Sequence, residues 1–257
     1  MSKLSLTALY IAGAENVDGL LPGSIRHIGQ IADEVIVVAS ADDGTGQLAA
    51  EAGATVVCRP WPHDYARQRN YALSLVRTDA VLILDADEFI DDAFGDRWPD
   101  VMHRRVGALS FPTLHYVRPT GGPLGLHLAD NWYPDLHPRC FRMSPALHYE
   151  GGIHEQPMDY GEGIILPSIH LHHFGWARAE EFLTRKVTSR NGEELAGGYS
   201  AGVHELWSGP WSDCQPEWLP RPSGFEESML VRGEANERAA LAAEAGEPVW
   251  SSSPVAV

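Results

Sequence analysis

Cysteine is scarce in this sequence. Three cysteines occur among the 257 residues, at Cys58, Cys140 and Cys214, and no two of them form a Cys-x-x-Cys pair. An odd number of widely separated cysteines does not build the disulfide framework of a small secreted domain. We therefore expect the protein to work in a reducing compartment, of which the cytoplasm is the simplest.

Basic residues are also few. Lys and Arg number 19 against 35 Asp and Glu, which gives a formal net charge of −16, and protonating all 12 His would still leave −4. Non-specific binding to nucleic acid needs a basic surface that releases counterions, and anionic membranes repel an acidic surface. We expect no non-specific nucleic-acid binding.

Long apolar runs are absent as well. No stretch reaches the roughly 18 apolar residues that suggest a transmembrane helix. The first apolar stretch is followed by Glu15 and Asp18 and lacks the longer apolar segment and cleavage site of a secretory signal. These absences predict a soluble protein with no membrane span.

Three common motifs are missing too. The sequence contains no Gly-x-x-x-x-Gly-Lys loop, no Gly-x-Gly-x-x-Gly fingerprint and no Gly-x-Ser-x-Gly elbow. These motifs bind nucleoside triphosphates, bind dinucleotides and expose a nucleophilic serine, respectively. The sequence therefore lacks the usual signals of an ATPase, a dehydrogenase or a serine hydrolase.

The first half of the chain alternates short apolar runs with amphipathic segments. Expected strands are 4–11, 34–39, 54–58 and 80–84, and expected helices are 20–31, 44–52 and 64–76, the last with Asp64 as its N-cap. Such alternation predicts an α/β fold, with a mostly parallel sheet and helices on both faces. The second half is less regular, with extended segments expected at 106–117, 139–142 and 164–172 and a helix at 177–191.

Three acids directly follow the apolar run 80–84. Asp85, Asp87 and Glu88 have no basic residue near them in the sequence. Ligands of open α/β sheets bind at the carboxyl ends of strands, and carboxylates at i and i+2 can face one hard cation. A solvated acidic turn is the alternative, but the apolar strand upstream favours a cation site.

The block 36–89 resembles the nucleotide-sugar half of the family 2 glycosyltransferases, which have the GT-A (Rossmann-like) fold. The matching pieces are, in order, the strand EVIVVA, the helix start Asp42-Asp43-Gly44-Thr45, the strand ATVV, the helix segment YARQRNYAL and the strand that ends in Asp85-Ala86-Asp87-Glu88. The resemblance implies that Asp87 binds a divalent cation, Mn²⁺ or Mg²⁺, and that Asp85 binds the ribose or a metal-bound water. The cation would neutralise the diphosphate that leaves during transfer.

The same resemblance suggests further donor-binding residues. Asp42 and Asp43 match the segment that approaches the nucleotide, Arg69 matches a residue near the diphosphate, and Lys186 on the expected helix 177–191 is another candidate. Family members usually carry an acid at the position occupied here by Ala39, where it contacts the base. This departure leaves the base of the donor open, although a UDP-type donor is the expected one.

Two segments of the second half add candidates by the same resemblance. The stretch Tyr149-Glu150-Gly151-Gly152-Ile153-His154-Glu155 is similar to a strand, glycine turn and His-Glu pair of the family, which implies that Glu155 is the general base. The stretch His173-Phe174-Gly175 matches a histidine that can complete the metal shell. Strand alternation places His170 and His172 on one face and His173 on the other.

Histidines are dense in this part of the chain, which raises a rival interpretation. Six of them, His137, His148, His154, His170, His172 and His173, fall within 137–173 and could form a His/Asp metal site for hydrolysis. No His-Glu-x-x-His or similar spacing supports that site. The tryptophans Trp132, Trp207, Trp211 and Trp218 could stack on a sugar or pack against the domain.

The resemblance implies a metal-dependent, inverting glycosyltransferase that uses a nucleoside-diphosphate sugar, with an unknown acceptor. We expect a catalytic domain at 1–196, divided into a nucleotide-sugar half at 1–90 and an acceptor half at 91–196. An irregular, Trp- and Pro-rich extension would follow at 197–257 and could support a homo-oligomer. A sugar-nucleotidyltransferase and a nucleotide-sugar or carbohydrate-binding module without transfer activity remain alternatives.

Overall fold

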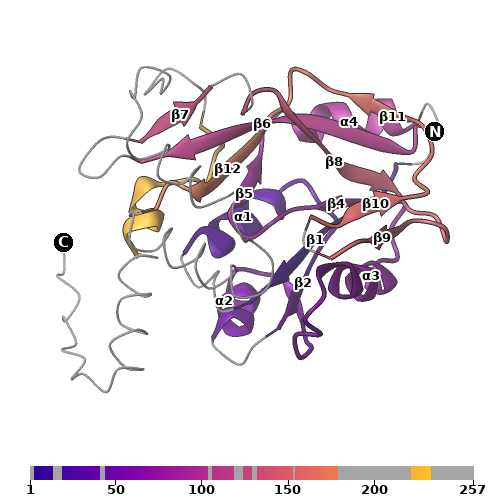
Figure 1. Ribbon diagram of the computed structural model, residues 1–257, viewed down its shortest axis with the longest axis horizontal. Helices are drawn as coiled ribbons and strands as arrows, with labels where there is room; N and C mark the ends of the chain where they lie inside the picture. Colours follow the sequence, from indigo (N-terminus) through magenta and orange to yellow (C-terminus); the bar gives the residue numbers. More distant parts are fainter. Residues whose placement is uncertain are drawn as a thin grey trace.

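The computed structural model describes residues 3–13, 19–40, 44–103, 106–118, 124–128, 132–152, 154–178 and 221–232. Its elements are β1 (Leu6–Ala12), α1 (Leu20–Ile28), β2 (Glu34–Ala39), α2 (Thr45–Glu51), β3 (Thr55–Cys58), α3 (Tyr65–Leu75), β4 (Ala80–Ile83), β5 (Glu88–Ile90), α4 (Phe94–Met102), β6 (Ala108–Val117), β7 (Gly125–His127), β8 (Asp135–Arg142), β9 (His148–Glu150), β10 (Gln156–Met158), β11 (Gly163–Ile165) and β12 (Leu171–Trp176) (Figure 1).

One large sheet dominates the fold. Its main path runs β3-β2-β1-β4-β8-β6-β12-β5, and β7 and β11 also pair with β6. All pairings from β3 to β4 are parallel, whereas β8 runs antiparallel to both β4 and β6. Parallel pairings outnumber antiparallel ones by five to four in the described part of this sheet. The predicted α/β fold with a mostly parallel sheet is confirmed.

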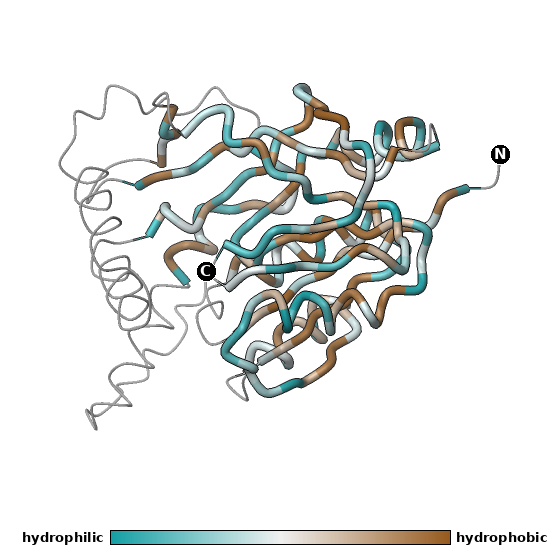
Figure 2. The backbone as a smooth tube through the Cα atoms, turned by 45° about the vertical axis from the view of Figure 1, so that its right-hand side comes forward, coloured by the Kyte–Doolittle hydropathy of each residue, from teal (hydrophilic) through white to brown (hydrophobic). Residues whose placement is uncertain are grey.

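Helices cover both faces of the sheet, as expected. Side-chain alternation along β4 sends Leu82 to one face and Val81 to the other. Helices α1, α2 and α4 pack on the first face, through residues that include Leu21, Ile25, Ala49, Phe94 and Trp98. Helix α3 packs on the second face, through Ala66, Ala72 and Leu73. Figure 2 shows hydrophobic stretches along the strands in the middle of the molecule.

The local signals explain these elements. Five of the six residues in β2 are buried and only Glu34 is partly exposed, as a strand covered on both faces requires. Each such Val or Ile contributes about 1.5–3 kcal/mol by leaving water. Helix α3 begins where the Asp64 carboxylate accepts a hydrogen bond from the backbone N–H of Arg67 at 2.8 Å, so the predicted N-cap is confirmed.

One predicted strand is wrong. The segment 164–172 is not continuous but divides into β11, which ends at Ile165, and β12, which begins at Leu171. Between them Pro167 lacks a backbone N–H, and Ile169 N–H donates to Leu166 O in a turn. Both strands pair parallel to β6, and β12 places its histidines between β6 and β5.

Residues 221–232 return to the domain. Phe225, Met229 and Leu230 are buried against Phe89 of β5 and Phe174 of β12. The Phe225 and Phe174 rings stack with centroids 3.9 Å apart. The rest of the expected extension, and all but the first two residues of the expected helix 177–191, lie outside the described residues. None of the described helices is long and apolar enough to cross a membrane.

Candidate functional site

The predicted acids lie in the link between β4 and β5. Leu84 N–H still donates to Leu9 O of β1, and Glu88 N–H then donates to Asp85 O, which closes a turn. Because the backbone turns here, Asp85 and Asp87 do not continue a strand and their carboxylates take different partners. Asp87 and Glu88 have side chains only 13% and 4% exposed, and Asp85 is 37% exposed.

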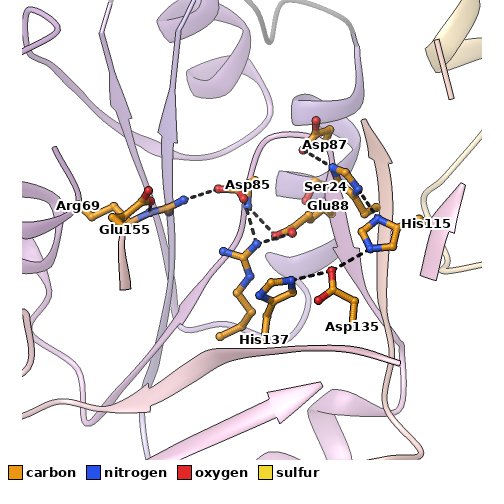
Figure 3. A network of polar contacts seen from close by, with 11 residues as sticks. Ser24, Arg69, Asp85, Asp87, Glu88, His115, Asp135, His137 and Glu155 are labelled. Carbon is orange, nitrogen blue, oxygen red and sulfur yellow. Dashed lines mark hydrogen bonds and ion pairs between the residues drawn. The ribbon is translucent and has the colours of Figure 1, made fainter. Parts of the chain in front are cut away.

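Two arginines from distant segments hold Asp85 (Figure 3). Arg69 of α3 donates through Nη2 to Asp85 Oδ1 at 2.6 Å. Arg139 of β8 donates through Nη2 to Asp85 Oδ2 at 3.0 Å and to Glu88 Oε1 at 2.5 Å. The buried acids therefore have cationic partners that no nearby sequence position indicated.

These contacts shift the two acids in opposite directions. Burial would raise the pKa of Asp85, but the positive charges of Arg139 and Arg69 hold that pKa well below its ordinary range. Burial raises the pKa of Glu88 to about 7, because Arg139 offsets the desolvation only in part and the negative charge of Asp85 adds to it. Asp85 is thus a firmly anionic anchor for both arginines.

Glu155 reaches the same network from the other side. Arg69 Nε donates to Glu155 Oε1, and the Glu155 side chain is 9% exposed. Its position depends on Asn70, which donates to Tyr149 O at 2.8 Å and accepts from Tyr149 N–H at 2.7 Å. This pair of bonds fastens β9 to α3, and Glu155 follows β9 in the hairpin. The structure therefore brings together the predicted Glu155, Arg69 and Asp85.

Asp87 lies near His173, the other residue that the sequence predicted as a metal ligand. His173 Nε2 lies 3.8 Å from Asp87 Oδ1. A Cβ atom built on Gly175 would lie 2.5 Å from His173 Nε2 and 2.6 Å from Asp87 Oδ2. Both polar atoms thus approach Gly175 so closely that no side chain fits at this position.

The predicted separation of His170 and His172 from His173 is confirmed. His172 Nε2 and His170 Nδ1 contact opposite oxygens of Asp91, at 2.8 and 3.1 Å, away from Asp87. Burial would raise the pKa of Asp91, but hydrogen bonds from His170 and His172 hold it well below its usual range. Tyr116 OH contacts the other ring nitrogen of His172 at 2.9 Å. These histidines are structural partners of Asp91.

Within the described residues, no cluster of side chains supports the rival hydrolytic metal site. Among the residues that the structure describes, no group of three or more His, Cys, Asp or Glu side chains could hold a metal ion. Asp42, Asp43 and Lys186, the other predicted donor-binding residues, lie outside the described part of the chain, as do Trp207, Trp211 and Trp218.

Sequence reasoning missed three residues of this region. Arg139 belongs to the Asp85 network, and His115 and Asp135 lie behind His173. One signal was available for His115, because it is a polar residue inside the otherwise largely apolar run ALSFPTLHYV, now β6. For Arg139 the sequence offered only a position in an expected strand.

Comparison with known proteins assigns part of this chain. Residues 19–95 match the family model of glycosyl transferase family 2. This segment contains Arg69, Asp85 and Asp87, and it ends before Glu155 and His173. The match covers β2, β3 and β4 of the parallel half, without β1, and the turn with the acids.

Curated relatives agree with this match. An uncharacterized glycosyltransferase of Rickettsia conorii is 42% identical over 74 residues, which are 28% of this chain and 26% of the relative. A TPR repeat-containing protein of Synechococcus elongatus is 28% identical over 158 residues, which are 60% of this chain and 35% of the relative. The chain thus spans about a third or less of the length of these relatives.

Solved structures give a weaker likeness. TarS of S. aureus aligns with 79% of this chain and 70% of its own, at 12% identity and a TM-score of 0.44. The family match and the glycosyltransferase relatives together support a glycosyltransferase.

Proposed function

We propose that the protein is a metal-dependent, inverting glycosyltransferase that moves a sugar from a nucleoside-diphosphate sugar, of UDP type, to an acceptor hydroxyl or another nucleophile. The observation that carries the proposal is that the Asp87 carboxylate and the His173 imidazole face each other beside Gly175. Asp87 belongs to the segment that matches the family, just after a buried strand, where α/β sheets bind ligands.

The residues present fit a divalent cation. A carboxylate oxygen and an imidazole nitrogen, both of them ligand types that divalent cations accept, face each other at 3.8 Å. Two protein ligands suit Mg²⁺ or Mn²⁺ in enzymes whose substrate phosphates complete the shell. Asp87 and His173 would hold the ion, and when bound it supplies Lewis-acid neutralisation of the departing diphosphate.

Glu155 is the proposed general base. Glu155 Oε1 already accepts a hydrogen bond from Arg69 Nε. We therefore assign Oε2 as the atom that receives the proton of the acceptor hydroxyl while the acceptor oxygen bonds to the sugar. The bond from the sugar to the diphosphate breaks in the same displacement. Arg69 acts here by orientation, since its guanidinium joins Glu155 to Asp85 and fixes the carboxylate in place. Asp42, Asp43 and Lys186 remain proposed contacts to the donor.

Substituting Glu155 by glutamine is expected to separate binding from catalysis. Glu155→Gln keeps the shape of the side chain and can still accept from Arg69, so binding of UDP-glucose with Mn²⁺ should change little. Release of UDP should fall by about 10²–10⁴-fold, the usual contribution of a general base. Calorimetry measures the binding, and a coupled assay for UDP measures release from a panel of UDP-sugars with and without Mn²⁺.

Glu150 supplies the matched control on the same hairpin. Its side chain is 65% exposed and contacts His148 on the surface of the hairpin, so Glu150→Gln should retain wild-type release. An active Glu155→Gln protein would place the base elsewhere. A wild-type protein that releases UDP from none of the sugars, with either metal, would count against transfer and in favour of a binding module.

A further inference from the structure

A chain of polar contacts lies behind His173. His115 of β6 pairs with His173 of β12 in the sheet register. Their Nδ1 atoms are 2.9 Å apart and the two rings are perpendicular. On its far side, His115 Nε2 contacts Asp135 Oδ2 of β8 at 3.0 Å, and His137 Nε2 contacts the same oxygen at 2.9 Å (Figure 3).

The hydrogen atoms in this series of polar contacts can be assigned one after another. Hydrogen bonds from His115 and His137 hold the pKa of Asp135 well below its usual range, so its carboxylate only accepts. His115 must therefore carry its hydrogen on Nε2. A neutral His115 then has a lone pair on Nδ1, and the 2.9 Å contact requires a hydrogen on His173 Nδ1.

The assignment reaches the proposed cation ligands. With its hydrogen on Nδ1, neutral His173 presents a lone pair at Nε2, the atom that faces Asp87 beside Gly175. The opposite assignment would place the lone pairs of His115 Nδ1 and His173 Nδ1 against each other at 2.9 Å. A lone pair at Nε2 and a carboxylate oxygen are both ligands that a divalent cation accepts.

The neighbouring side chains fix the geometry of these polar contacts. Asp135 and His137 are two residues apart on β8, so they leave the strand on the same side. The Trp132 ring packs edge-on against His115, with centroids 5.1 Å apart. The His115 side chain is 10% exposed, which limits the water that could replace its contact to His173.

We propose that His115, anchored by Asp135, is a positioning residue that holds His173 in the Nδ1–H tautomer, so that His173 Nε2 and Asp87 bind the divalent cation together. The inference rests on the proposed function, because it concerns the same cation. It assigns roles to His115 and Asp135, which sequence reasoning left without one. Groups that orient a metal-binding histidine in this way commonly contribute about 10–100-fold to metal affinity.

Two substitutions of His115 separate orientation from folding. His115→Phe keeps a ring against Trp132 but removes both nitrogens, so His173 Nδ1–H loses its acceptor. His115→Asn places an amide oxygen near the position of Nδ1, where it can accept from His173. We expect the Mn²⁺ dissociation constant, measured with UDP present, to rise about 10–100-fold in His115→Phe and to recover largely in His115→Asn.

Nitrogen NMR of the protein without metal determines directly which ring nitrogen of His173 carries the hydrogen. We expect the wild-type His173 to carry its hydrogen on Nδ1, although Nε2–H is the commoner tautomer of free histidine, and we expect His115→Phe to shift it to Nε2. Thermal unfolding of both variants checks that each is folded.

The outcomes distinguish the two proposals. A wild-type His173 protonated at Nε2, or a folded His115→Phe protein that binds Mn²⁺ as tightly as the wild type, would overturn the role of His115 alone. A wild-type protein that binds no Mn²⁺ in the presence of UDP would overturn the proposed function, and the role of His115 in metal binding with it.

Discussion

Replacing Asp87 with alanine is expected to abolish Mn²⁺-dependent release of UDP from UDP-sugars. The substitution removes the carboxylate that faces His173 beside Gly175. Lewis-acid stabilisation of a departing group contributes several kcal/mol, so the rate should fall by about 10³-fold or more. Initial rates of UDP formation at saturating Mn²⁺ measure the effect.

The fold should survive this change. The backbone of Asp87 holds β12 through its carbonyl, which accepts from Phe174 N–H at 2.9 Å and does not involve the side chain. Asp100→Ala is the matched control, because Asp100 is an exposed acid near the end of α4, away from the turn. A folded Asp87→Ala protein with wild-type Mn²⁺-dependent rates would remove Asp87 from the mechanism.

Replacing Arg139 with methionine is expected to lower the free energy of unfolding by about 3–5 kcal/mol. Arg139 is the cationic partner of Glu88 and one of the two that hold Asp85. Its loss leaves the Glu88 side chain, only 4% exposed, without its ion-pair partner. Unfolding in urea, followed by circular dichroism, measures the change, and exposed Arg97→Met should stay within about 0.5 kcal/mol of the wild type.

A double substitution tests the cause. In Arg139→Met combined with Glu88→Gln, a neutral amide replaces the buried carboxyl that has lost its partner, so a substantial part of the lost stability should return. A free energy of unfolding for Arg139→Met within about 1 kcal/mol of the wild-type value would be little more than the effect of a surface substitution. In that case the network does not stabilise the turn that holds the acids.

Local signals in the sequence predicted much of the parallel half of the fold. The run EVIVVA became β2 because its apolar, β-branched residues fill both faces of the sheet, and Asp64 began α3 as an N-cap. Alternation along β12 correctly separated His172 from His173. These features depend on a few adjacent residues, which a sequence displays directly.

The partners of the acids could not be predicted in the same way. Arg69 and Arg139 are 16 and 54 residues from Asp85, and the sheet order β4-β8-β6 brings β8 beside β4. The turn at Asp85 also separates its carboxylate from that of Asp87, whereas strand spacing predicted that both could face one ion. Such contacts depend on strand order and turn geometry, neither of which follows from local periodicity.

The coupling between metal and nucleotide tests the central claim most directly. Titration calorimetry of UDP into the wild-type protein, with and without Mn²⁺, measures it in one experiment. Because Asp87 and His173 supply only two ligands, we expect Mn²⁺ to tighten UDP binding by at least about 10-fold, within the usual range of coupling between two ligands. Equal affinity for UDP with and without Mn²⁺, or no binding in either case, would contradict a cation site that joins these two side chains to the diphosphate of a UDP-type donor.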